Sequence, residues 1–273
     1  MTINCKGTLV DLSSPKVMGI LNITPDSFYD GGKYKNESEI LHQTEKMLTE
    51  GATFIDVGAY SSRPGAAHIS EGEELNRILP VINLLIKEFP EILISVDTFR
   101  AKIASETVQR GASIINDISG GNMDEKMFST ISNLNVPYIV MHMLGTPQNM
   151  QKNPVYKNVT QEVISFFAEK IFQLHQLKVN DIIIDVGFGF GKTITHNFEL
   201  LQNLSLFKSL DAPILAGVSR KSMLYKTLDT SSKEALNATT SANTIALLNG
   251  ANILRVHDVK EAVEAVKIVE QVL

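Results

Sequence analysis

The chain has 273 residues, of which 44% are hydrophobic and 20% charged, and its formal net charge at pH 7 is −5. This composition is typical of globular proteins, and the acidic balance argues against a nucleic-acid binder that neutralises phosphates over its surface. Cys5 is the only cysteine, which excludes an intrachain disulfide, and no apolar run approaches the ~20 residues of a membrane span. We expect one domain covering 1–273, without a signal peptide and located in the cytoplasm, because a lone cysteine suits a reducing compartment.

Short apolar runs that end on a polar residue recur along the chain and predict eight buried strands. The first runs from Val17 to Leu21 and ends at Asn22. A short sequence motif recurs at 51–56, 111–116 and 250–255. It begins with a glycine, which is typical of a helix end, and continues into a short strand. The other strands end, in chain order, at Asp56, Asp97, Asn116, His142, Asp185, Ser219 and Arg255.

Apolar residues with helical spacing occupy the segments between these strands, for example in 75–89, 163–174 and 259–269. Eight strands that alternate with helices predict an α/β fold, a (β/α)₈ barrel of the TIM type, and the segment from Thr8 to Leu12 predicts a short N-terminal hairpin. An open doubly wound sheet is the alternative. The barrel is favoured because the units are regular and a dinucleotide-binding glycine turn is missing.

In such barrels the loops that follow the strands build the active site. The polar strand ends therefore indicate chemistry, although Asp56 and Asp117 are equally compatible with caps of the following helices. The first long loop, 22–32, carries Phe28 and could close over a substrate. The second, 58–65, holds Arg63 beside hydroxyls and a proline, which suits an oxyanion.

Two later loops carry further candidates. The glycine-rich stretch 185–192 lacks the spacing of a P-loop or a dinucleotide turn, but Phe190 within it could stack on a flat ring. Arg255 and His257 lie two residues apart and should point the same way on an extended strand. Barrels often bind phosphate after strands seven and eight, so this pair favours an anion site over a purely structural histidine.

Acidic and amide side chains from three strands should meet at the barrel mouth. Asp97, Asn116 and Asp185 need partners when they are buried, and a planar heterocycle with adjacent N–H groups would supply them. Lys221 could then bond the carbonyl of that ring. A metal held by the two acids is the alternative, which the lack of a metal-binding His/Glu spacing disfavours.

Taken in order, the motifs resemble those of the dihydropteroate synthase family over nearly the whole chain. They are 22–28, 61–65, 95–98, 115–117, 141–143, 185–192, 217–222 and 255–258. The sequence departs from the common family pattern at Tyr60, where many members carry Glu, at Ser62, where many carry Thr, and at Val186, where Pro is common. These departures concern the shape of the second loop more than the reaction.

The resemblance implies a homodimeric TIM barrel, a sulfonamide target, that joins 6-hydroxymethyl-7,8-dihydropterin diphosphate to 4-aminobenzoate with Mg²⁺. It implies these pterin-binding residues: Asp97, Asn116, Asp185 and Lys221. The residues implied for the diphosphate are Asn22, Ser62, Arg63, Arg255 and His257, with Asn22 also contacting Mg²⁺. Those implied for 4-aminobenzoate are Phe28, Pro64, Phe190, Ser219 and Ser222. The catalytic set is Asp30 of the first loop, Arg63, Lys221, Arg255 and His257.

We expect a dissociative reaction in which diphosphate leaves before the amine attacks, so that no protein nucleophile is needed. Two alternatives share the pterin-binding acids. One is the methyltetrahydrofolate-binding domain of corrinoid methyltransferases, which needs no diphosphate site and therefore no equivalent of Arg63, Arg255 and His257. The other is a catalytically silent pterin-binding paralogue, in which some anion-site residues should be missing. Neither fits the complete set of motifs in this sequence.

Overall fold

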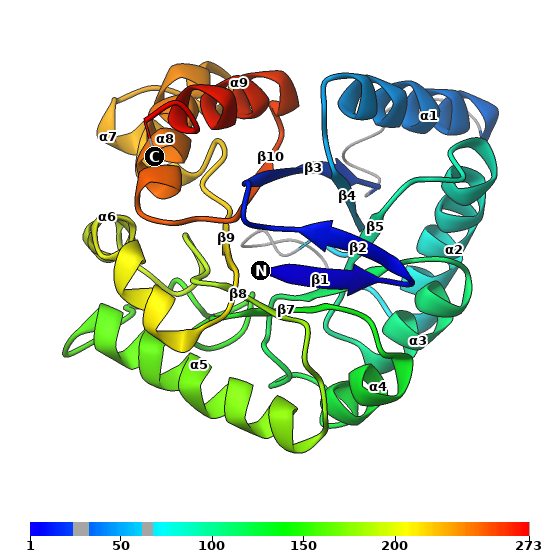
Figure 1. Cartoon of the computed structure of the whole chain (residues 1–273), viewed down its shortest axis with the longest axis horizontal. Coiled ribbons are helices and arrows are strands. Elements are labelled where there is room, and N and C mark those ends of the chain that lie inside the picture. The colour runs from blue at the N-terminus through cyan, green and yellow to red at the C-terminus, as the bar shows by residue number, and fades with distance from the viewer. Residues whose placement is uncertain (24–32, 62–67, 273) are drawn as a thin grey trace.

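The computed structural model describes residues 1–23, 33–61 and 68–272. Eight parallel strands close into a barrel in which the last strand pairs with the first, and helices surround it (Figure 1). The barrel strands are β3 (Lys16–Asn22), β4 (Phe54–Gly58), β5 (Ile94–Asp97), β6 (Ile114–Asp117), β7 (Tyr138–Met141), β8 (Ile182–Asp185), β9 (Ile214–Ala216) and β10 (Ile253–Val256). The predicted TIM barrel is therefore confirmed.

Amphipathic helices cover the barrel, and each buries one face against the strands. In α2 (Glu71–Glu88), Ile78, Ile82 and Leu85 are buried, and the Ser70 hydroxyl caps the helix by accepting a bond from the Glu73 amide at 3.1 Å. The other helices described are α1 (Lys33–Thr49), α3 (Ala101–Gln109), α4 (Met127–Leu134), α5 (Val159–Gln176), α6 (Ile194–Gln202), α7 (Ser222–Thr227), α8 (Leu236–Leu248) and α9 (Val259–Val269), with the 3-10 helices η2 (Leu204–Leu210) and η3 (Ser232–Glu234).

The glycines of the recurring sequence motif follow helix ends, as the sequence predicted. Gly51, Gly111 and Gly250 have φ values of 102°, 117° and 97°, in the left-handed region that glycine adopts without strain. Each lets the chain reverse from a helix into the next barrel strand.

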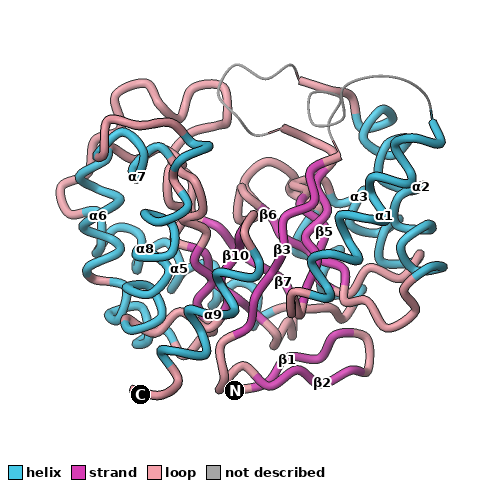
Figure 2. Tube along the Cα trace, turned by 90° about the horizontal axis from the view of Figure 1, so that it is seen from above, coloured by secondary structure: helices cyan, strands magenta, loops and turns pink. Residues whose placement is uncertain are grey.

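A two-stranded antiparallel hairpin of β1 (Thr2–Cys5) and β2 (Thr8–Asp11) covers one end of the barrel (Figure 2). Its apolar side chains, including Ile3 and Leu12, pack on the inward residues at the strand starts. Those residues are Met18, Phe54, Ile114, Ile139, Ile183, Leu215 and Ile253. The hairpin therefore closes the barrel floor with an apolar plug.

Side chains alternate along a strand, so the residue two positions further on also points inward. At this second level the barrel interior becomes polar. Starting from the apolar floor, β4 next presents Asp56, β6 Asn116, β8 Asp185 and β10 Arg255. The alternation thus produces an apolar floor and a polar layer near the strand ends.

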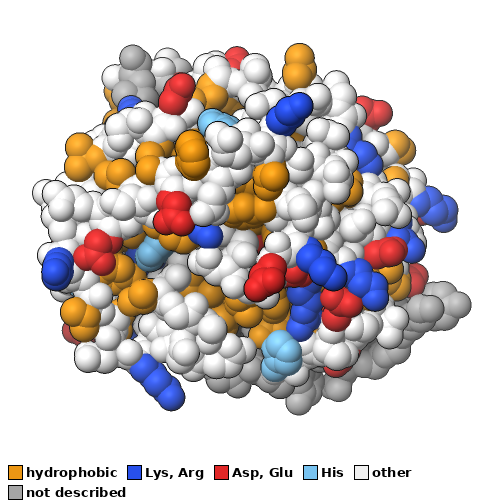
Figure 3. Space-filling model, turned by 90° about the horizontal axis from the view of Figure 1, so that it is seen from below, with side chains coloured by type: hydrophobic (Ala, Val, Ile, Leu, Met, Phe, Trp, Pro, Cys, Tyr) orange, Lys and Arg blue, Asp and Glu red, His pale blue; other side chains and the backbone are white. Residues whose placement is uncertain are grey.

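The outer surface carries charges of both signs. No helix within the described residues is long and apolar enough to cross a membrane. On the face shown in Figure 3, lysine and arginine side chains lie among acidic ones and form no continuous basic stripe. This mixture agrees with the net charge of −5.

Candidate active site

Asp56 is the centre of the polar layer. Its carboxylate is fully buried and accepts bonds from the Ser95 hydroxyl at 2.6 Å, the Asn116 amide at 3.1 Å and Nε of Arg255 at 2.6 Å. These groups come from β4, β5, β6 and β10, so a single carboxylate joins four strands. Sequence reasoning did not assign Asp56 to the site. Its position two residues after the inward Phe54 was the signal that could have placed it there.

Asp97 lies beside this cluster and shares Arg255 with it. The Arg255 guanidinium donates to Asp97 at 3.1 Å, and the Asp97 side chain keeps 17% of its surface exposed. Burial raises the pKa of Asp97 to about 7, with Arg255 opposing the rise and Asp56 adding to it. Asp97 can therefore gain or lose a proton near neutral pH, and its ionised form is the one that accepts bonds from the N–H donors of a ring.

Asp185 and Lys221 are two further charged groups of the mouth, and each influences the pKa of the other. Burial raises the pKa of Asp185, while Lys221 opposes that rise, and burial lowers the pKa of Lys221 to about 8. The Lys221 ammonium also donates to the carbonyl of Phe188 and lies 4.7 Å from the centre of the Phe190 ring. A cation, a carboxylate and an aromatic ring thus lie at one side of the mouth.

Glycines at inward positions leave space between these groups. A Cβ atom on Gly217 would lie 3.8 Å from Oδ2 of Asp185 and 4.0 Å from Nζ of Lys221. A Cβ on Gly58 would lie 3.4 Å from the Cβ of Asp97 and 3.6 Å from the amide oxygen of Asn22. A larger residue at either position would fill the space that a flat ligand needs.

The glycine-rich loop after β8 is held by side chains from several elements. Gly187 and Gly189 have φ values of 70° and 83°. The Gly187 amide donates to Asp185 at 2.8 Å, and the Gly189 amide donates to Asn197 at 2.6 Å. Phe190 is partly buried and packs on an apolar cluster that includes Met141 and Met143. The loop is therefore an ordered wall of the mouth.

In the structure His257 and Arg255 contact different residues. The sequence predicted that the two side chains would bind one anion together. β10 ends at Val256, so His257 lies just beyond the strand. Its Nδ1 is 3.1 Å from the Ser219 hydroxyl, which also accepts a bond from the His257 amide at 3.1 Å. Arg255 instead contacts the two acids. The shared anion site stays a prediction.

The structure describes only some of the other predicted site residues. Asn22 ends β3, and Ser222 begins α7. Tyr60, one of the departures from the family pattern, accepts a bond from the Gln148 amide at 3.1 Å and lies 3.2 Å from Nδ1 of His68. The remaining predicted residues lie outside the described residues: Phe28, Asp30, Ser62, Arg63 and Pro64.

The capping alternative for Asp56 and Asp117 is wrong for both residues. Asp56 lies inside β4, as described above. Asp117 faces away from the barrel interior, accepts a bond from the Tyr138 hydroxyl at 2.6 Å and holds the turn after β6 through the amides of Ser119 and Gly121. The next helix, α4, begins only at Met127. Asp117 is therefore structural.

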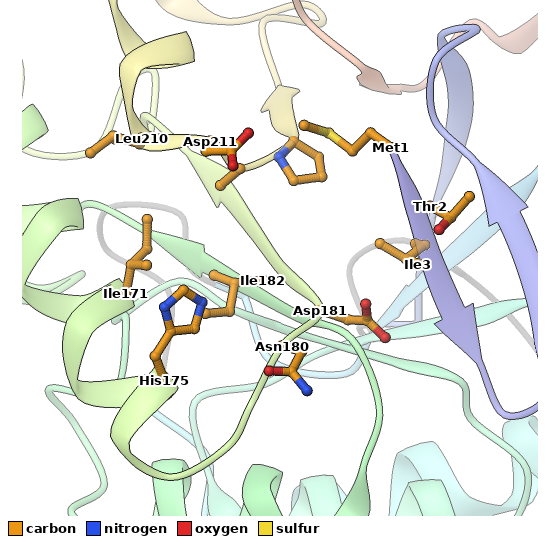
Figure 4. Close-up of a pocket in the computed structure, with 12 residues that line it drawn as sticks. Met1, Thr2, Ile3, Ile171, His175, Asn180, Asp181, Ile182, Leu210 and Asp211 are labelled. Atoms are coloured by element: carbon orange, nitrogen blue, oxygen red, sulfur yellow. The ribbon is translucent and has the colours of Figure 1, made fainter.

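A separate pocket of about 200 Å³ lies at the opposite end of the barrel (Figure 4). It lies between Met1 and Ile3 of the hairpin and the starts of strands, with His175 and Asp181 among its polar residues. Asp181 accepts a bond from the Asn4 amide at 3.0 Å, which ties the hairpin to the floor. Barrel chemistry occurs at the carboxyl ends of strands, so this pocket is not the candidate active site.

Known proteins resemble this chain in sequence over its full length. A family model described as pterin binding enzyme matches residues 18–257. The dihydropteroate synthase of Escherichia coli K12 is 42% identical over 275 residues, covering 100% of this chain and 97% of that protein. The chain belongs to the dihydropteroate synthase family.

Solved structures of the dihydropteroate synthase family have the same fold. The Yersinia pestis enzyme, solved with a sulfonamide drug, gives a TM-score of 0.93 at 41% identity and covers 100% of this chain and 99% of its own. The Xanthomonas albilineans enzyme with 4-aminobenzoic acid gives a TM-score of 0.92 at 35% identity, covering 99% and 97%. The family expected from the sequence motifs is thereby confirmed.

Proposed function

We propose that this chain condenses 6-hydroxymethyl-7,8-dihydropterin diphosphate with 4-aminobenzoate, giving 7,8-dihydropteroate and diphosphate, as a transferase of folate synthesis. The observation that carries this proposal is the polar layer at the barrel mouth, with the space that Gly58 and Gly217 leave beside it. The full-length identity of 42% to the Escherichia coli dihydropteroate synthase supports the same activity. This activity is the one that the motifs predicted.

The pterin would lie on the polar layer. Its ring presents adjacent N–H donors, which match the carboxylates of Asp97 and Asp185. Asn116 offers the amide oxygen while its nitrogen is held by Asp56. Lys221 donates to acceptors on the ring. Because hydrogen bonds to other strands and to the loop after β8 hold these groups, the site is organised before the substrate arrives.

The diphosphate would face the rim formed by the ends of β3, β9 and β10. Arg255 and His257 would provide donors to the diphosphate at this rim, and we place Ser62 and Arg63 of the second loop with them from the family resemblance. Arg255 also contacts Asp97. Arg255 would therefore connect the pterin-binding Asp97 with the diphosphate site.

Mg²⁺ would be held at Asn22. Within the described residues, no group of three or more acidic, histidine or cysteine side chains could hold a metal ion. The single amide oxygen of Asn22 still fits Mg²⁺, which usually takes few protein ligands and completes its shell with phosphate oxygens and water. When bound, the ion would neutralise charge on the diphosphate.

The reaction breaks the bond between the pterin methylene carbon and the diphosphate oxygen, and the electron pair leaves with the oxygen. The reduced pterin carries the positive charge that develops, while Arg255 and His257 stabilise the departing anion. The 4-aminobenzoate nitrogen then forms the new bond to the methylene carbon and loses a proton. No thiol takes part, because Cys5 lies in the floor plug and burial raises the pKa of its thiol to about 12.

The substrate 4-aminobenzoate would stack beside Phe190, near Ser219 and Ser222, with Phe28 and Pro64 of the two long loops completing its site. Phe190 provides the aromatic surface for its ring. The cytoplasmic location expected from the single cysteine remains a prediction.

We expect the purified chain, mixed with the pterin diphosphate and Mg²⁺, to release diphosphate only when 4-aminobenzoate is added and to form 7,8-dihydropteroate in equal amount. Phosphate-coupled detection and chromatography measure the two products. Tight pterin binding without any aminobenzoate-dependent release would contradict the proposal and indicate a catalytically silent pterin-binding protein.

The chain would act as a homodimer through the side formed by α6, α7 and α8, which contact one another (Figure 1). This side exposes large apolar residues that are spaced along helix faces: Ile194 and Phe198 on α6, and Ile245 and Leu248 on α8. Exposed apolar groups of this kind are typical of association surfaces.

A further inference from the structure

Lys192 is a buried lysine for which the proposed reaction has no use. Only 3% of the residue is exposed, and it follows the glycine-rich loop directly. Its Nζ lies 2.9 Å from Nδ1 of His142, 3.0 Å from the carbonyl oxygens of Gly187 and Phe190, and 3.2 Å from the carbonyl oxygen of His142. A buried ammonium is costly unless such partners surround it. Four acceptors around three N–H donors form a complete cage.

Burial and the neighbouring charges shift the pKa values of both Lys192 and His142. Burial lowers the pKa of Lys192 to about 7, with Asp185 opposing the shift and Lys221 adding to it. Burial, together with Lys192, lowers the pKa of His142 to about 2, so the imidazole stays neutral. Nδ1 of His142 can then accept a bond from the ammonium. The cage thus joins the end of β7 to the loop after β8.

The carbonyls of the glycine-rich loop are each held by a side chain from elsewhere. Lys221 bonds the carbonyl of Phe188, Gln151 bonds that of Gly189 at 2.6 Å, and Tyr156 bonds that of Gly191 at 2.8 Å. Lys192 holds the other two, Gly187 and Phe190. A segment with three glycines has high conformational freedom, so these bonds determine its shape.

We propose that Lys192 is a positioning residue for the second substrate: by tying the Phe190 and Gly187 carbonyls to His142, it fixes the Phe190 ring at the 4-aminobenzoate site. This inference rests on the proposed function, because that function assigns Phe190 to 4-aminobenzoate. The ring lies at the mouth, with the Lys221 ammonium 4.7 Å from its centre. Without Lys192 the loop would lose the bond that holds the Phe190 backbone to β7.

The pterin half of the site is held mainly by strand pairing and less by Lys192. Asp185 belongs to β8, which pairs with β7 and β9, and its carboxylate accepts a bond from the Gly187 amide. The Phe190 amide still donates to the Gly187 carbonyl at 3.0 Å, but this bond lies within the loop. Loss of Lys192 should therefore affect 4-aminobenzoate more than the pterin.

The test is to replace Lys192 by Met, which keeps the stem length and removes the donors, and by Gln, which keeps two donors without charge. In Lys192→Met we expect the KM for 4-aminobenzoate to rise about tenfold or more, since small displacements of positioning groups have effects of this size. The Kd for 6-hydroxymethyl-7,8-dihydropterin, measured by calorimetry, should change by less than about threefold. Lys192→Gln should recover part of the loss in KM.

Lys6→Met is the matched control, because the Lys6 ammonium also donates to a backbone carbonyl, that of Val108 at 2.8 Å, but in the hairpin far from the mouth. It should change neither constant. Hydrogen exchange of residues 187–191 should be faster in Lys192→Met than in the parent or the control. This measurement needs no turnover, so it tests the loop even if the parent chain releases no diphosphate and the proposed function fails.

Equal losses for both substrates, or unchanged KM and exchange in a folded Lys192 variant, would overturn the proposal. If Lys192→Met does not fold, Lys192→Gln alone decides. A raised KM for 4-aminobenzoate with near-parent pterin affinity supports it, and parent-like values contradict it.

Discussion

At the scale of single residues, the barrel mouth depends on one arginine shared by two acids. Arg255 contacts the fully buried Asp56 through Nε and the partly exposed Asp97 through a terminal nitrogen. The sequence identified Arg255 as an anion ligand but missed Asp56. The structure gives the arginine a second role, because removing it would leave Asp56 as a buried charge without its cation.

Arg255→Ala is therefore expected to lower the free energy of unfolding by about 3 kcal/mol, the usual cost of breaking a buried ion pair. It should also slow cleavage of the carbon–oxygen bond far more than it weakens binding of the free pterin. Urea unfolding measures the first effect, and rapid-quench kinetics with pterin titration measures the second. In an Asp56→Asn background the stability loss should shrink while the kinetic loss remains. Equal kinetic and binding losses would argue against the assignment to the leaving group.

The raised pKa of Asp97 predicts a pH dependence. Its pKa is about 7 in the folded chain, against an ordinary value of 3.8. Between these two pH values the folded state binds the proton and the unfolded state does not. The contribution of Asp97 to stability therefore falls as pH rises from 3.8 to about 7. Pterin binding should show the opposite trend, because the ring donors need the carboxylate.

We expect pterin affinity to fall by about tenfold per pH unit below 7, as one proton competes with the ligand. Calorimetric titrations between pH 5 and pH 8 measure the slope. Asp97→Asn is the control, and its affinity should be lower than that of the parent at pH 8 and nearly independent of pH. A parent affinity that is flat over this range would contradict a role for Asp97 ionisation in binding, and an affinity that falls as pH rises would show that Asp97 binds in its protonated form.

At the scale of elements, the loop after β8 shows how backbone geometry builds a wall of the site. Gly187 has a φ of 70°, and a Cβ there would lie 2.0 Å from the carbonyl oxygen of His142. Both features exclude a side chain. Gly72, near the start of α2, has open space around its Cβ position and no unusual φ.

Gly187→Ala is expected to lower the free energy of unfolding by more than about 2 kcal/mol, because strain and a backbone clash combine. Gly72→Ala, the matched control, should be neutral or stabilising by up to about 1 kcal/mol, since alanine favours the helix. Denaturant unfolding compares the two variants. If both proteins unfold at the parent midpoint, the loop is not held as described.

At the scale of the whole molecule, the side formed by α6, α7 and α8 is the proposed dimer surface. Ile245→Asp places a charge among its apolar residues and should weaken association by at least about tenfold, because a buried unpaired charge is strongly unfavourable. Sedimentation velocity over a range of concentrations measures the change. Leu9→Asp is the control, since Leu9 is also highly exposed but lies in the floor hairpin. Dimerisation that resists Ile245→Asp would place the interface elsewhere.

The sequence by itself determined the barrel. It contains eight apolar runs that end on polar residues and alternate with amphipathic helices, and a closed parallel barrel buries all eight runs. The motif order also predicted the family, which is confirmed, and it predicted that Asp97, Asn116 and Asp185 would meet near the strand ends, since the strand ends of a barrel converge. Only the tertiary structure decided which polar groups pair. Asp56 with Arg255, His257 with Ser219, and Lys192 with His142 are contacts between segments remote in sequence. Their partners depend on strand register and on loop shape, which no local pattern of residues encodes.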